Sequence, residues 1–104
     1  MHNKYVDIMK QSEFYDSIFK IQDSAAGISN ILKSIGTVDD SSRKDAMVGN
    51  AERFIQSWYD NNMKFYSGWF WDVRKKILRR MLNDHYNDLM AQLDSISAVN
   101  TVDI

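Results

Sequence analysis

The chain has 104 residues, enough for one domain, and 44% of them are apolar, including three Trp, five Tyr and five Phe, which excludes a disordered chain. It has no Pro and only four Gly, too few turn residues for an all-β fold, and it has no Cys, which excludes disulfides, thiol catalysis and thiolate metal sites. Because 13 Lys and Arg face 14 Asp and Glu, the chain as a whole is not attracted to nucleic acid or anionic membranes. We therefore predict a single all-α domain over residues 1–104.

The first predicted helix covers residues 4–34. Apolar residues recur along it at alternating steps of four and three, which places them on one helical face: Phe14, Ile18, Ile21, Ala25, Ile28, Leu32 and Ile35. Gly27 lies within this helix, where glycine costs roughly 1 kcal/mol relative to alanine. We interpret Gly27 as a point of close packing against a neighbouring helix, with a kink or break as the alternative.

Residues 36–46, GTVDDSSRKDA, predict a junction between two helices. Gly36 suits a helix C-terminus because glycine accepts positive φ without a steric penalty. The side-chain oxygens of residues 39–42 can accept hydrogen bonds from the free N–H groups of a new helix. Ser42 and Asp45 also have the spacing of a capping box. A second helix is expected from residue 42.

Ser67-Gly68 decides whether one helix or two follow this junction. With a turn there, helices at 42–66 and 69–96 complete a three-helix bundle with the first helix. Without it, a helix over 42–96 would be ~80 Å long at ~1.5 Å per residue, and the resulting helical hairpin would need dimerisation to cover it. We predict the turn. The tail 97–104 has neither caps nor an apolar stripe and is expected to fray.

The stretch GWFWDVRKKILRR, residues 68–80, divides into two faces on a helical wheel. A wide apolar arc continues to residue 93: Phe70, Trp71, Val73, Ile77, Leu78, Met81, Leu82, Leu89 and Leu93. The opposite arc carries Lys75, Lys76, Arg79 and Arg80, with Trp69 at its upstream end. This basic arc is interpreted either as a solvated helix face or as a contact surface for an acidic partner protein.

Aromatic residues are concentrated in residues 54–71, on more than one helical face. One interpretation is that the rings fill the interior of the bundle at the turn. The other is that one of four rings is exposed and binds a partner or a second copy, because Trp and Tyr are enriched at binding hot spots. These four are Trp58, Tyr59, Tyr66 and Trp69.

Signatures of catalysis and metal binding are absent from the sequence. His2 lies near the N-terminus, and His85 continues the apolar stripe, as expected of a core or interface histidine. Neither Glu13 nor Glu52 is followed three residues later by His, and no Gly-rich phosphate loop or nucleophile triad is present. We predict a non-enzymatic protein without a cofactor or metal.

These patterns favour a small regulator or adaptor that binds a protein partner of acidic character. The candidate binding residues are Trp58, Tyr59, Tyr66, Trp69, Lys75, Lys76, Arg79 and Arg80. Nucleic-acid binding through the helix face 75–80 is the alternative, and the slightly acidic chain argues against it. The wide apolar arc at 70–93 also favours a homodimer. No window approaches the ~18 apolar residues that span a bilayer, so we expect a cytoplasmic protein that does not bind membranes.

Overall fold

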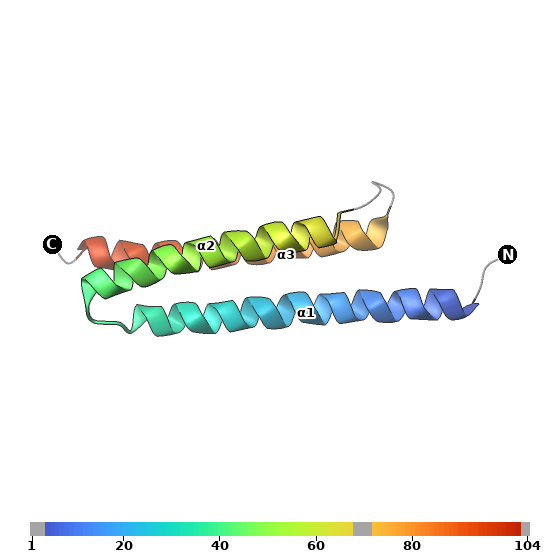
Figure 1. Cartoon of the computed structure of the whole chain (residues 1–104), viewed down its shortest axis with the longest axis horizontal. Coiled ribbons are helices and arrows are strands. Elements are labelled where there is room, and N and C mark those ends of the chain that lie inside the picture. Colours follow the sequence, from blue (N-terminus) through green and yellow to red (C-terminus); the bar gives the residue numbers. More distant parts are fainter. Residues whose placement is uncertain (1–3, 68–71, 103–104) are drawn as a thin grey trace.

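The computed structural model describes residues 4–67 and 72–102, and it describes side chains over 10–67 and 72–97. Its elements are three helices, α1 (Lys4–Gly36), α2 (Ser41–Phe65) and α3 (Val73–Val102). Figure 1 shows that α1 and α3 run in the same direction and that α2 runs in the opposite one. Helix α3 packs against both other helices, whereas α1 and α2 contact each other least. The predicted all-α three-helix bundle is confirmed.

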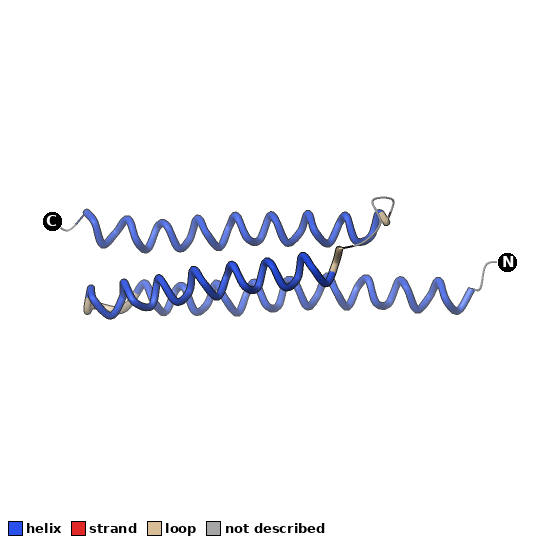
Figure 2. The backbone as a smooth tube through the Cα atoms, turned by 45° about the horizontal axis from the view of Figure 1, so that its top comes forward, coloured by secondary structure: helices blue, strands red, loops and turns tan. Residues whose placement is uncertain are grey.

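The bundle is elongated. Its principal extents are 68 × 22 × 16 Å, and its radius of gyration is 17.6 Å. A compact domain of this length has a radius of gyration of roughly 13 Å. Figure 2 shows that the N-terminal part of α1 extends beyond the turn between α2 and α3. Because three long helices form a narrow bundle, much of the surface of each helix stays in contact with solvent.

The core lies along the predicted apolar stripe of α1. One buried cluster joins all three helices through Ala25, Ile28, Leu32, Ile35, Ala51, Ile55, Leu89 and Leu93. A second cluster, nearer the α2–α3 turn, contains Ile21, Tyr66, Leu78 and Leu82. Trp58 packs against both clusters from α2. The stripe from Ile21 to Ile35 was therefore placed correctly on the buried face.

The junction between α1 and α2 differs in detail from the prediction. Helix α2 begins at Ser41, one residue early, and its N-cap is Asp40, whose side chain accepts a hydrogen bond from the backbone N–H of Arg43 at 3.2 Å. The capping box based on Ser42 is thus wrong, because Ser42 already lies inside the helix. Gly36 ends α1 without positive φ. The backbone N–H and the hydroxyl of Thr37 both bond the carbonyl of Ser34 instead.

The predicted turn between the second and third helices is confirmed, because α2 ends at Phe65 and α3 begins at Val73. The expected start at 69 is wrong. Asp72 accepts the backbone N–H of Lys75 on its carboxylate at 3.2 Å and that of Lys76 on its carbonyl at 3.0 Å, so it begins the helix. Gly68 and the residues 69–71 lie outside the described residues. At its other end α3 continues to Val102 rather than ending near 96, and fraying of the tail stays a prediction.

The interpretation of Gly27 is wrong. Helix α1 is unbroken through this residue, so no break occurs. A Cβ atom added at Gly27 would meet nothing within 4 Å, so no neighbouring helix packs closely there. The residue is exposed, whereas Ala25 and Ile28 on either side of it are buried. The helical period places Gly27 on the solvent side of the stripe.

Candidate functional site

Two of the four predicted basic residues reach from α3 to backbone carbonyls at the end of α2. Lys75 Nζ donates a hydrogen bond to the carbonyl of Ser67 at 3.2 Å, and Arg79 Nη1 donates one to the carbonyl of Tyr66 at 2.8 Å. Both side chains are half-buried. The carbonyls at the end of α2 lack partners within their own helix and carry the negative end of its dipole. Lys75 and Arg79 therefore cap α2.

Lys76 and Arg80, the other two predicted basic residues, are exposed. They are four residues apart and so share one face of α3. Neither side chain makes a hydrogen bond or ion pair with another residue that the structure describes. The first turn of α3 contains no acidic residue. Like charges at this spacing, near the positive end of a helix dipole, weaken the helix.

The predicted aromatic residues of α2 lie mainly inside the bundle. Tyr66 is buried with 5% of its surface exposed, so it is not an exposed ring of the kind that the second interpretation requires. Trp58 is half-buried, and its Nε1 donates to Ser24 Oγ on α1 at 2.9 Å. Tyr59 is also half-buried and donates its hydroxyl proton to Asn83 Oδ1 on α3. These rings fill the space between helices because α2 is in contact with both neighbours.

Trp69 lies outside the described residues. Other aromatic side chains are exposed instead: Tyr15, Phe19, Phe54 and Phe65. Val73 and Ile77, assigned to the core arc by the helical wheel, are exposed too. The helical wheel predicted which apolar residues share a stripe, but it did not predict which edge of that stripe a neighbouring helix covers. That depends on the distance between helices, which is set by contacts between distant segments.

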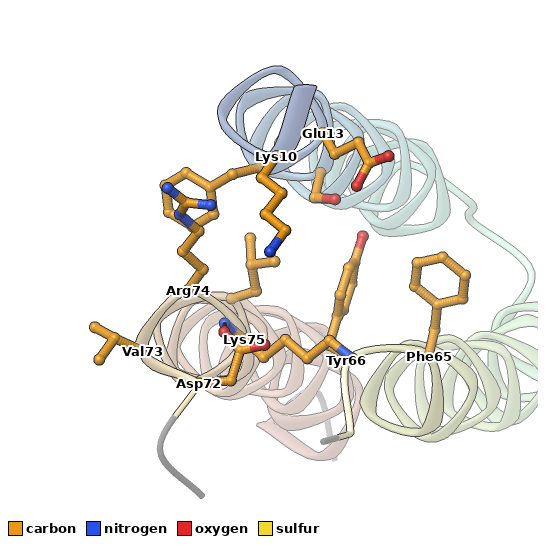
Figure 3. Close-up of a pocket in the computed structure, with 11 residues that line it drawn as sticks. Lys10, Glu13, Phe65, Tyr66, Asp72, Val73, Arg74 and Lys75 are labelled. Atoms are coloured by element: carbon orange, nitrogen blue, oxygen red, sulfur yellow. Dashed lines mark hydrogen bonds between the residues drawn. The ribbon is translucent and has the colours of Figure 1, made fainter. Parts of the chain in front are cut away.

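A pocket of about 660 Å³ lies at the end of the bundle where α1 passes the α2–α3 turn. Its apolar wall includes Phe14, Phe65, Tyr66, Val73 and Leu78. Its charged wall contains three cations and two carboxylates: Lys10, Arg74, Lys75, Glu13 and Asp72. Figure 3 shows Lys10 extending from α1 toward α3 and Arg74 extending from α3 toward α1. The pocket thus combines apolar surface with cations from two helices.

The charges of α3 are separated along its length. Its first two turns contain five cations, Arg74, Lys75, Lys76, Arg79 and Arg80, and its carboxylates begin only at Asp84. We call the pocket cations Lys10, Arg74 and Lys75, together with exposed Lys76 and Arg80, the basic end. The basic end is locally positive although the whole chain has a formal net charge of −1. Such a local field attracts anionic groups to one end of the molecule.

His85 is half-buried on α3. Across residues 4–67 and 72–102, no three side chains of His, Cys, Asp or Glu gather as metal ligands would. Within the same ranges, no helix combines the length and apolar character of a membrane span. Comparison with protein families, with curated proteins and with solved structures finds no match to the chain. The functional argument therefore depends on the geometry of the basic end.

Proposed function

We propose that the protein is a small non-enzymatic regulator or adaptor that binds an acidic segment of another protein at its basic end. The observation that carries this proposal is the position of Arg74, Lys75, Lys76, Arg79 and Arg80 in the first two turns of α3. A helix N-terminus has a partial positive charge equivalent to roughly half a proton charge. Acidic side chains stabilise that position and cations oppose it.

The hydrogen bonds that cap α2 explain the positions of only two of these five cations. Lys75 and Arg79 are offset by the carbonyls at the end of α2. Lys76 and Arg80 make no such contact and repel each other across one helical turn, with Asp72 and Asp84 as their other neighbours on that face. A partner carboxylate placed between them would remove this repulsion and form charge-assisted hydrogen bonds. Binding would therefore convert an unfavourable feature of the free protein into a favourable contact.

The apolar wall of the pocket narrows the class of partner. Phe65 is 75% exposed and Val73 is 66% exposed, beside the cations Arg74 and Lys75. An apolar side chain of a partner would remove this surface from water at roughly 25 cal/mol per Å². Acidic residues beside that side chain would meet the lining cations Lys10, Arg74 and Lys75. A segment that also passes around the first turn of α3 would bring further acidic residues to Lys76 and Arg80. We expect the ligand to be a short segment with one large apolar residue among acidic ones.

A defined peptide pair tests this proposal. One fluorescently labelled peptide carries Trp or Leu among Glu residues, and its control carries the same apolar residue among Ser residues. We expect the acidic peptide to bind, and the double variant Lys76→Glu/Arg80→Glu to weaken that binding at least about tenfold, or 1.4 kcal/mol. The matched control variant Lys20→Glu/Lys33→Glu reverses two exposed charges on α1 and should bind normally.

Two outcomes would count against this function. Equal loss of binding in both charge-reversed variants would mean that only net charge matters. Binding to a single-stranded oligonucleotide, with an affinity that falls steeply as salt is added and no binding of the acidic peptide, would replace the protein partner by nucleic acid. Once the peptide class is established, the same variants can be compared in affinity purifications from nuclease-treated extract of the source cells.

A further inference from the structure

A second, different surface lies between α1 and α2, which contact each other less than either contacts α3. A groove of about 320 Å³ opens there. Asn50 is its polar lining residue, and every other residue that lines it is apolar. Ile31 on α1 and Phe54 on α2 line the groove and are 53% and 57% exposed. A folded chain in water gains nothing by leaving two such side chains beside an apolar groove.

The groove differs from the basic end in its lack of charge. No charged side chain lines it. The basic end suits an acidic ligand, whereas the groove suits an apolar surface that brings no carboxylate or cation with it. Burying an unpaired charge there would be costly. The occupant must therefore be apolar where it enters the groove.

The elongated chain exposes more surface than a compact monomer of its mass. The accessible surface is 7713 Å² for a mass of 12.2 kDa. A folded monomer of this mass exposes roughly 6,100 Å². The excess is larger than the roughly 800 Å² that each partner of a stable complex buries. A face of the molecule 68 Å long and 22 Å wide has room for such an interface.

We propose that the occupant is a second copy of this chain, bound through the same groove by a two-fold axis. A two-fold interface uses one patch twice, so the patch must contain both a projecting group and a recess. The groove contains both, because Phe54 and Ile31 are more than half exposed at its edges and the buried side chains of Ala51, Ile28 and Ile35 form its floor. Phe54 of the partner subunit enters this recess, and the two α1–α2 pairs form a helical bundle.

This interface differs from the apolar arc at 70–93, which was expected to self-associate. Leu78, Leu82, Leu89 and Leu93 of that arc are buried within one protomer. The groove is also independent of the acidic ligand proposed for the basic end. Loss of dimerisation and loss of peptide binding are separate readouts on separate variants.

Sedimentation equilibrium of the full chain over about 1–200 μM protein tests the dimer. We expect the wild-type chain to be dimeric within this range and Phe54→Gln to weaken association at least about tenfold. Phe19→Gln is the matched control, because Phe19 is 61% exposed on α1 and does not line the groove. Circular dichroism and thermal unfolding of each variant confirm that it is folded.

A cross-linking measurement keeps the test decisive if Phe54→Gln fails to fold. The chain has no Cys, so a single Cys can be placed at Asn50 or, as a control, at Phe19. We expect a short bis-maleimide to join Asn50→Cys protomers and not Phe19→Cys protomers. A wild-type chain that stays monomeric up to 200 μM, or one whose association resists Phe54→Gln and is not cross-linked through Asn50→Cys, would overturn the proposal.

Discussion

Arg79 on α3 donates a hydrogen bond from Nη1 to the main-chain carbonyl of Tyr66, 2.8 Å away. The contact joins the second turn of one helix to the end of the helix before it. It satisfies a carbonyl whose residue is buried and which lies beyond the last hydrogen-bonded turn of α2. The side chain of Arg79 thus helps to set where the bundle turns.

Removing this contact should destabilise the protein. Hydrogen bonds to charged groups contribute about 1.5–3 kcal/mol, and partial exposure of Arg79 places the expected loss for Arg79→Ala near the lower end of that range. Denaturant unfolding monitored by circular dichroism measures the loss. Arg80→Ala, one residue further on and exposed, is the control and should change the free energy of unfolding by less than about 0.5 kcal/mol. Equal losses in the two variants would contradict a capping role for Arg79.

Reversing the exposed cations should lower stability slightly. In Lys76→Glu/Arg80→Glu the i, i+4 repulsion between two cations becomes a repulsion between two acids, and the new side chains also lie four residues from Asp72 and Asp84. We expect the free energy of unfolding to fall by about 0.5–1 kcal/mol at low salt and by less at high salt, because each like-charge pair at this spacing costs about 0.2–0.5 kcal/mol. The comparison uses urea, which leaves the ionic strength unchanged. A free energy of unfolding that does not change would mean that these charges do not interact along the helix.

The sequence predicted the buried faces better than it predicted the roles of polar side chains. Ile21, Leu32 and Leu82 belong to periodic stripes, and period alone identifies such positions. The capping role of Lys75 and Arg79 could not be predicted from their spacing. Their acceptors are backbone carbonyls that become available only where α2 ends and the chain turns.

The residues of the candidate site were also predicted only in part, because contacts between helices decide which side chains are exposed. Lys76 and Arg80 were identified by their helical phase, and their exposure agrees with it. Tyr66 and Trp58 were assigned to a binding surface by residue type, yet contacts with other helices cover them. Phe54 was not among the predicted binding residues, and it is more than half exposed. Which edge of a stripe is covered depends on how closely α1 approaches α2, and no local pattern encodes that distance.

The indole of Trp58 links α2 to α1 by a hydrogen bond, so the energy of this bond can be used to test how closely the two helices approach. Its N–H bonds Ser24 Oγ, which in turn donates to the carbonyl of Ile21 at 3.0 Å. Trp58→Phe removes the donor, and we expect a loss of about 1–2 kcal/mol, which includes the smaller ring as well as the hydrogen bond. A double-mutant cycle with Ser24→Ala isolates the bond itself. The expected coupling is about 0.5–1.5 kcal/mol, and additive losses would mean that the two groups do not interact.

Gly27 lies in the middle of α1, where it is exposed and has open space at its Cβ position. Gly27→Ala should therefore raise the free energy of unfolding by about 0.5–1 kcal/mol, because alanine reduces the freedom of the unfolded chain and meets no steric obstacle in the folded one. The reverse substitution at its exposed neighbour, Ala26→Gly, should lower it by a similar amount. Both are measured by urea unfolding of the full chain at one protein concentration, since association would add to apparent stability. A destabilised Gly27→Ala protein would mean that something packs on this face in solution. Measuring it again at tenfold lower protein concentration would then separate a second copy from a contact within one chain.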